Sequence, residues 1–161
     1  DAATGKQKWR AIVGGSITTA PAVKDGMLYF TSQDGKIYCA RIKHQAVIWS
    51  YKAQGQIETS PAVADGKVFF GDISGNVTAL NAQTGSKLWA NNTGGSVFSS
   101  PAYFNGRIYI GSNSDKLFAL DANTGNQAWG LKLEGDIIAT PAVTSDRIVI
   151  GTAGGNICAI K

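Results

Sequence analysis

The sequence contains few of the side chains on which most enzymes and metal sites depend. Its 161 residues include one histidine, two cysteines that are not adjacent, and two glutamates. A hard cation prefers six to eight oxygen ligands, and no acidic cluster supplies them. The single histidine, His44, has no nucleophile placed near it by the sequence pattern. These shortages predict that the chain is not an enzyme and that it binds neither a metal nor a cofactor.

Long runs of one residue type are also missing. The net charge is +4, but lysine and arginine are scattered and no basic run of five or more occurs, so no nucleic-acid partner is expected. No apolar stretch is long enough for a membrane-spanning helix, and no segment has the 3.6-residue period of a helical solenoid. The 20 glycines and 43% apolar residues favour many short strands joined by tight turns.

The two cysteines occupy neighbouring positions of an internal repeat. Cys39 stands where the other repeats have alanine, and Cys158 stands one place earlier in its own repeat. Adjacent positions of a strand point to opposite faces. A disulfide is therefore permitted but not required, and two small buried thiols are the expected state.

The spacing of the tryptophans reveals an internal repeat. The four tryptophans are spaced 40 residues apart, and a proline follows each of them 12 residues later. These tryptophans, which we expect to be structural, are Trp9, Trp49, Trp89 and Trp129. Four repeats of 40 account for 160 of the 161 residues, and a period of this length is typical of repeat arrays and propellers. We treat residues 1–161 as one repeat domain.

Each repeat is predicted to form four short strands. In the second repeat the predicted strands are Ile57–Val63, Lys67–Gly71, Asn76–Asn81 and Ser86–Ala90, separated by turns at Asp65-Gly66, Ser74-Gly75 and Thr84-Gly85. Segments such as Val68-Phe69-Phe70 are apolar on both faces, so both faces of each sheet must be covered. Radial stacking of four-stranded sheets satisfies this, and the sequence predicts an all-β propeller of four antiparallel blades.

A motif before each tryptophan resembles a known family. The best copy, Ala119 to Trp129, reads Ala-x-Asp-x-x-Thr-Gly-x-x-x-Trp and is similar to the tryptophan-docking motif of pyrroloquinoline-quinone (PQQ) type propeller repeats. The copy ending at Trp49 keeps only the tryptophan and has His44-Gln45 at the turn. The resemblance implies that each indole packs between neighbouring blades of an eight-bladed ring.

Two functional branches follow from the resemblance. In the enzymatic branch, dehydrogenases hold PQQ and calcium with a stacking tryptophan, often a vicinal disulfide, and Glu, Asn and Asp ligands; this chain has no Cys-Cys pair and no spare tryptophan. The non-catalytic branch contains outer-membrane assembly scaffolds, which implies a periplasmic or cell-envelope location. We expect a scaffold that binds a protein partner through propeller loops. The alternative is a fragment of a PQQ- and calcium-dependent dehydrogenase.

Four residues are candidates for partner contact. Arg41, Lys43 and His44 cluster in an irregular turn that would suit an acidic partner, and Glu58 is the one charge among the positions predicted to line the axis. For each of them, an ordinary solvated side chain is the competing interpretation. Propeller loops are where such contacts are expected, because the strands are needed for packing.

The two ends of the chain are complementary. Asp1 to Arg10 corresponds to a fourth strand without its first three, and Asp136 to Lys161 corresponds to three strands without a fourth. The chain is therefore expected to be a fragment or half of a propeller. Closure within one chain would need blades wedged at about 90°, whereas two chains forming eight blades need about 45°. We expect a homodimer that forms an eight-bladed ring, with a four-bladed ring in one chain as the alternative.

Overall fold

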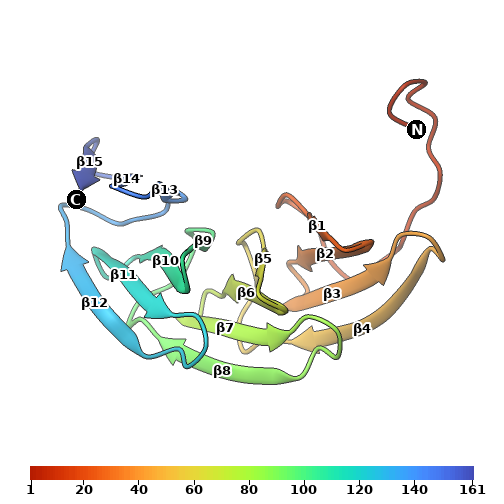
Figure 1. The fold of residues 1–161 in the computed structure, drawn as a ribbon, viewed down its shortest axis with the longest axis horizontal. Coiled ribbons are helices and arrows are strands. Elements are labelled where there is room, and N and C mark those ends of the chain that lie inside the picture. Colours follow the sequence, from red (N-terminus) through yellow and green to blue (C-terminus); the bar gives the residue numbers. More distant parts are fainter.

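The computed structural model describes all 161 residues and shows four antiparallel sheets arranged side by side in an open arc (Figure 1). The strands of the first two sheets are β1 Ala22–Lys24, β2 Met27–Ser32, β3 Lys36–Arg41, β4 Ala46–Lys52, β5 Ala62–Ala64, β6 Lys67–Gly71, β7 Asn76–Asn81 and β8 Lys87–Asn92. Those of the last two are β9 Ala102–Phe104, β10 Arg107–Ser112, β11 Lys116–Asp121, β12 Gln127–Lys132, β13 Ala142–Val143, β14 Ile148–Gly151 and β15 Ile157–Ile160.

Strand order within each sheet follows the chain from the inside of the arc outward. Three sheets have four strands, and the last, β13-β14-β15, has three. The innermost strands β1, β5, β9 and β13 lie next to one another, which confirms that the first strand of each repeat faces the axis. No helix is present, so the chain has no helical segment long and apolar enough to cross a membrane.

The tight turns follow the predicted chemistry. Asp25, Asp65 and Asn105 have φ of 50°, 48° and 46°, and the glycine after each also has positive φ, as a type I′ hairpin turn requires. In the first repeat Gln45 adopts φ 55° where a glycine stands in later repeats. The last repeat differs, because Ser145 and Asp146 do not adopt this turn and the strand before them is only two residues long.

The inner strands are shorter than predicted. The strand predicted over Ile57–Val63 begins only at Ala62. In the segment before it, hydrogen bonds to side chains take the place of the backbone hydrogen bonds between strands. The Thr59 hydroxyl donates to the Gly71 carbonyl at 2.9 Å and accepts from the Gly71 amide at 3.0 Å. The Ser60 amide donates to the Ser100 hydroxyl at 2.9 Å, and Pro61 has no amide hydrogen to donate.

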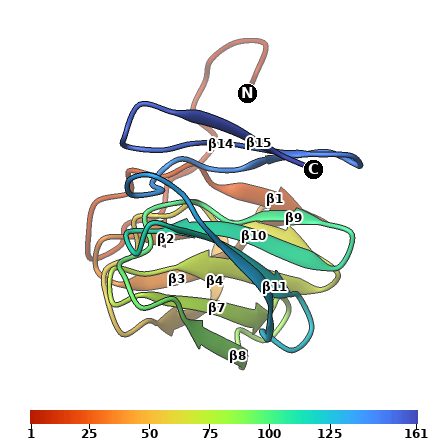
Figure 2. The same cartoon turned by 90° about the vertical axis from the view of Figure 1, so that its left-hand side faces the viewer.

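The apolar core lies between the sheets. Both faces of the central strands are buried, as the sequence predicts, and one cluster of side chains fills each interface between neighbouring sheets. The largest fully buried side chains include Phe69, Phe70, Leu80, Ile108 and Leu120. Figure 2 shows the sheets stacked as layers, with β14 and β15 lying over the rest.

A tryptophan joins the first sheet to the second, and another joins the second sheet to the third. The Trp49 indole N–H donates to the Ala82 carbonyl at 3.1 Å, and the Trp89 indole N–H donates to the Ala122 carbonyl at 3.1 Å. The turn that receives Trp89 contains Gly125, where a Cβ atom would lie 2.5 Å from the indole. Glycine is required there both for its φ of 74° and for this close approach.

The ends of the arc do not meet, so the structure contradicts a four-bladed ring closed within one chain (Figure 1). The predicted strand Asp1–Arg10 is also absent, because the strand that would pair with it lies at the opposite end of the arc. Instead, Trp9 and Val13 pack against the outer face of the first sheet near Phe30. The last sheet therefore lacks the fourth strand that the sequence predicts for it.

Replacing Trp89 with alanine is expected to lower the free energy of unfolding by about 3–5 kcal/mol, because it leaves a cavity and removes the bond to the next sheet. Leu88→Ala is the control: Leu88 is 47% exposed, so its loss should cost about 0.5 kcal/mol or less. Urea denaturation measures both. If Trp89→Ala lowers the free energy of unfolding by less than about 1 kcal/mol, the repeated tryptophans are not structural.

Candidate binding groove

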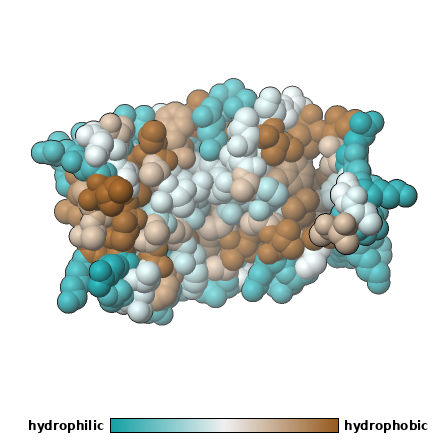
Figure 3. All heavy atoms as spheres, turned by 90° about the horizontal axis from the view of Figure 1, so that it is seen from above, coloured by the Kyte–Doolittle hydropathy of each residue, from teal (hydrophilic) through white to brown (hydrophobic).

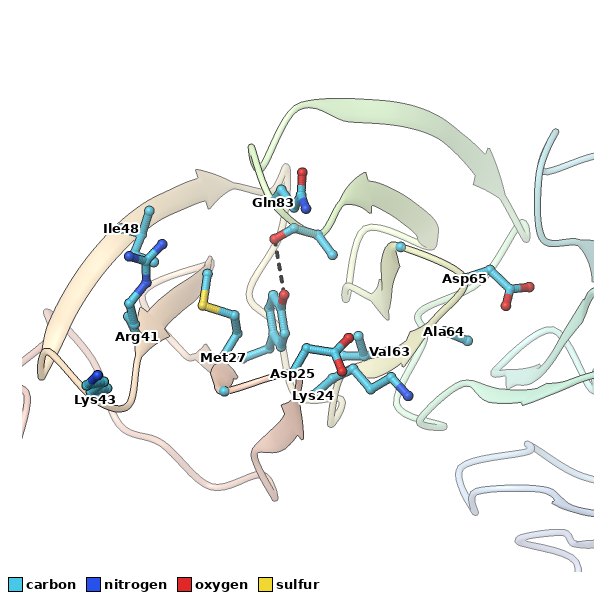
Figure 4. Close-up of a pocket in the computed structure, with 14 residues that line it drawn as sticks. Lys24, Asp25, Met27, Arg41, Lys43, Ile48, Val63, Ala64, Asp65 and Gln83 are labelled. Carbon is cyan, nitrogen blue, oxygen red and sulfur yellow. Dashed lines mark hydrogen bonds between the residues drawn. The ribbon is translucent and has the colours of Figure 1, made fainter.

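A groove of about 690 Å³ opens between the first and second sheets, at the rim where the hairpin turns lie (Figure 4). It is bounded by β2 and the turn before it, the β3–β4 turn, and the β5–β6 hairpin of the second sheet. The lining residues are Lys24, Asp25, Gly26, Met27, Tyr29, Arg41, Lys43, Ile48, Val63, Ala64, Asp65, Gly66, Ala82 and Gln83.

The floor of the groove is an aromatic pair. The Tyr29 ring packs on Trp49 with centroids 6.0 Å apart, and its hydroxyl donates to the Ala82 carbonyl at 3.2 Å. Tyr29 is only 3% exposed, and its burial raises the pKa of its hydroxyl to about 12. The phenol is therefore neutral at physiological pH and serves as a fixed, largely apolar surface.

One side chain decides whether such a groove is open. Between the second and third sheets, the Tyr103 ring stacks on Phe69 with centroids 6.3 Å apart. The residue 40 positions earlier is Val63 and the residue 40 positions later is Val143. Both valines line open grooves, the second of about 710 Å³ between the third and fourth sheets. The smaller side chain thus leaves unfilled the space that tyrosine occupies.

Three basic residues at the rim of the first groove have no basic counterparts one repeat later. Lys24, Arg41 and Lys43 line it, whereas the corresponding residues of the next repeat are Ala64, Asn81 and Gln83. Figure 4 shows Arg41 and Lys43 on the side of the first sheet's outer strands, with Lys24 and Asp25 opposite. The groove therefore combines an apolar floor with an excess of positive charge at its rim.

The structure brings only two of the four predicted contact residues together. Arg41 and Lys43 both line the groove, and both are exposed. His44 lies in the same exposed turn but outside the groove, and Glu58 is exposed in the segment before β5. A role in partner contact remains a prediction for all four residues, and Arg41 and Lys43 are the two that line the groove.

Sequence reasoning missed Lys24, Asp25, Tyr29 and Val63 as groove residues. A signal was present, because Tyr103 is the one large aromatic residue at a position that is valine in the other three repeats. Its meaning depends on knowing that this position faces the gap between neighbouring sheets.

The residues present do not fit a quinone site. No three His, Cys, Asp or Glu side chains gather as a metal site would require. Trp49 and Trp89 are both engaged by the carbonyl and the glycine of the following turn. The cysteines, Cys39 and Cys158, are free thiols.

Radial four-stranded sheets joined by docked tryptophans define a β-propeller built from PQQ-like repeats. The sequence profile of one family matches residues 1–97 and, in a second overlapping match, residues 73–161. This chain belongs to that family, which is described as outer membrane protein assembly factor BamB. No curated protein sequence gives a significant match.

Three solved structures share the fold. BamB from Moraxella catarrhalis matches with a TM-score of 0.81 and 20% identity over 91% of this chain and 47% of that one. The computationally designed Ika4 protein matches with a TM-score of 0.85 and 17% identity over 96% and 98%. A europium-containing methanol dehydrogenase matches with a TM-score of 0.73 and 22% identity over 81% and 27%. The chain thus spans about half the length of the BamB structure.

Val63→Tyr is expected to fill the first groove as Tyr103 fills the second and to raise the free energy of unfolding by about 0.5–2 kcal/mol. The matched control is Val143→Tyr. Val143→Tyr should raise the free energy of unfolding by less, because Asn105 occupies the position that corresponds to Asp65, whose carboxylate accepts the bond from Tyr103. Thermal unfolding measures both, and a lower melting temperature for Val63→Tyr would show that the groove is too narrow for a phenol ring.

Proposed function

We propose that this chain is a non-catalytic scaffold that binds partner proteins at the rim of its sheets. The observation that carries the proposal is the basic groove between the first and second sheets, which joins an aromatic floor to Lys24, Arg41 and Lys43. Membership of a family described as outer membrane protein assembly factors supports it. The two central strands of each of the first three sheets are mostly buried, so contact with a partner is left to the rim and the outer strands.

The family description also supports a location in the periplasm or elsewhere in the cell envelope. The dehydrogenase alternative has less support. The match to methanol dehydrogenase is 22% identical and covers 27% of that protein, so it shows only that the fold is shared. None of the residues described above gathers as the quinone and calcium sites of such enzymes would require.

The scaffold is further proposed to assemble from two copies of the chain. At the C-terminal end, Ile157 is 82% exposed, although the corresponding Ile37 and Leu117 are 0% exposed. At the N-terminal end, Ile17 is 48% exposed, although the corresponding Ile137 is 0% exposed. Figure 3 shows apolar residues at the surface of the left-hand end, where β13–β15 lie. A monomer rarely leaves such positions uncovered.

The docking turn at the N-terminus is formed but empty. The Asp1 carboxylate accepts a hydrogen bond from the Thr4 amide at 3.0 Å, as the Asp121 carboxylate does from the Thr124 amide at 2.8 Å. Gly5 has φ 68°, yet a Cβ atom there would meet nothing within 4 Å. The turn therefore has the form of a tryptophan receptor without its tryptophan.

The repeat spacing supports Trp129 of a second copy as the indole that fills this turn. Each docked indole bonds a carbonyl 33 residues later, from Trp49 to Ala82 and from Trp89 to Ala122. A carbonyl 33 residues after Trp129 would belong to position 162, which follows the last residue of this sequence. In a ring of eight 40-residue repeats from two copies, that position corresponds to residue 2 of the second copy. Trp129 would then donate to the Ala2 carbonyl of that copy.

Charge reversal tests the binding groove. The double substitution Arg41→Glu and Lys43→Glu is expected to leave folding unchanged, because both side chains are exposed, and to abolish capture of an acidic partner from a cell-envelope extract. Lys87→Glu, exposed on β8 and outside the groove, is the matched control. Equal capture by the double variant and the wild type would place the partner elsewhere.

Assembly is tested by light scattering on a sizing column. We expect a particle of twice the 16.9 kDa of one chain, and Ile157→Asp should convert it to the single-chain mass. Leu88→Asp, at an exposed apolar residue away from the ends, should stay assembled. A wild-type species that keeps the mass of one chain at all concentrations would reject the two-chain ring.

A further inference from the structure

The protein contains its own example of a filled groove. Between the second and third sheets, the Tyr103 hydroxyl donates to the Asp65 carboxylate and accepts from the Gly106 amide at 3.1 Å. Its ring stacks on Phe69 at an interplanar angle of 14°. Three elements thus hold the phenol: an aromatic floor, a carboxylate acceptor and a backbone donor.

The first groove repeats all three elements without the phenol. Tyr29 corresponds to Phe69, Asp25 to Asp65, and Gly66 to Gly106, each 40 residues earlier, and all three line the groove. The floor is held in the same way, since Tyr29 meets Trp49 at 6.0 Å and 49° while Phe69 meets Trp89 at 5.9 Å and 41°.

The carboxylate acceptor is free to bind. Among the lining residues of the groove, the one hydrogen bond drawn runs from Tyr29 to Ala82 (Figure 4). Asp25 and Val63 both line the groove, and Val63 stands at the position that Tyr103 occupies in the next repeat (Figure 4). The valine therefore leaves both the space and its polar partner available.

The third groove lacks this set. Val143 leaves it open, but the acceptor position holds Asn105, and the Asp-Gly type of hairpin turn is replaced by Ser145-Asp146. An open groove is thus not by itself a phenol site, and the third groove provides an internal control.

We propose that the first groove binds a tyrosine side chain from an acidic segment of the partner protein. The phenol enters the open groove above the buried Tyr29, donates to Asp25 and accepts from the Gly66 amide, as the Tyr103 hydroxyl does with Asp65 and Gly106 one groove later. The acidic flanks pair with Lys24, Arg41 and Lys43, which have no basic counterparts in the next repeat. This inference rests on the proposed scaffold function and specifies what its groove recognises.

The first test uses small probes and amide chemical shifts. The tyrosine analogue p-cresol should shift the Asp25 and Gly66 amides and should bind several-fold more tightly than toluene, which has no hydroxyl. Asp25→Asn should weaken that preference, because a neutral amide oxygen replaces the charged acceptor. Asparagine tolerates positive φ and already occupies the same turn position at Asn105, so this variant should fold. Tyr103→Val should create a second p-cresol site at Asp65 and Gly106.

The second test uses a short peptide with one tyrosine between glutamates, measured against the same peptide with phenylalanine. The tyrosine peptide should bind about tenfold more tightly, since its hydroxyl bonds to a carboxylate. Val63→Tyr should abolish binding of both by filling the groove, and Val143→Tyr should leave it unchanged. Equal affinity for the two peptides, or undiminished binding to Val63→Tyr that retains its melting temperature, would overturn the inference.

The outcomes also separate this inference from the scaffold proposal. Capture of an envelope partner that is lost on charge reversal but retained by Val63→Tyr would leave the scaffold in place and overturn the tyrosine site. Selective binding of the tyrosine peptide without any captured partner would support the site and count against the scaffold.

Discussion

The bond from an indole N–H to a carbonyl in the next sheet is the contact on which this architecture depends. It is directional, because the tryptophan lies on the outer strand of one sheet and the carbonyl lies in the docking turn of the next. Trp49 and Trp89 form this bond, whereas the Trp9 and Trp129 indoles form none in this open arc. A ring closed by a second copy, as proposed above, would give Trp129 an acceptor.

The aromatic floor at the rim is nearly the same in the first three sheets, because each tryptophan stands 5.9–6.0 Å from an aromatic ring of its own sheet. Against this constant floor, the side chain at one rim position decides whether a gap is filled. A tyrosine fills one gap and valines leave two open. Binding sites can thus arise at the rim without any change in the core, which separates folding from recognition in this fold.

Much of the fold could be predicted from the sequence. The tryptophan spacing gave the number of sheets, and the Asp-Gly pairs gave the hairpin turns, because both signals are local and repeated. The short inner strands could not be predicted, because Thr59 and Ser60 replace backbone ladder bonds with side-chain bonds to distant residues. Asp1–Arg10 has the sequence of a strand but forms none, because a strand requires a partner that its own chain does not place beside it.

Less of the candidate site could be predicted. Arg41 and Lys43 were found because an irregular turn with clustered charge is visible in the sequence, whereas His44 in the same turn does not line the groove. The groove itself depends on the difference between Val63 and Tyr103, which acquires meaning only when the two sheets are placed side by side. Asp25 appeared in the sequence only as a turn residue, although its carboxylate borders the open space.

Hydrogen exchange of the four indole N–H groups, followed by NMR, tests the central claim most directly. Trp49 and Trp89 should exchange slowly at every concentration, because their acceptors lie in the same chain. The account predicts that Trp129 becomes equally protected as the protein concentration rises and that deletion of residues 1–5 removes this protection. Rapid exchange at Trp129 in concentrated protein, with Trp49 and Trp89 still protected, would contradict it.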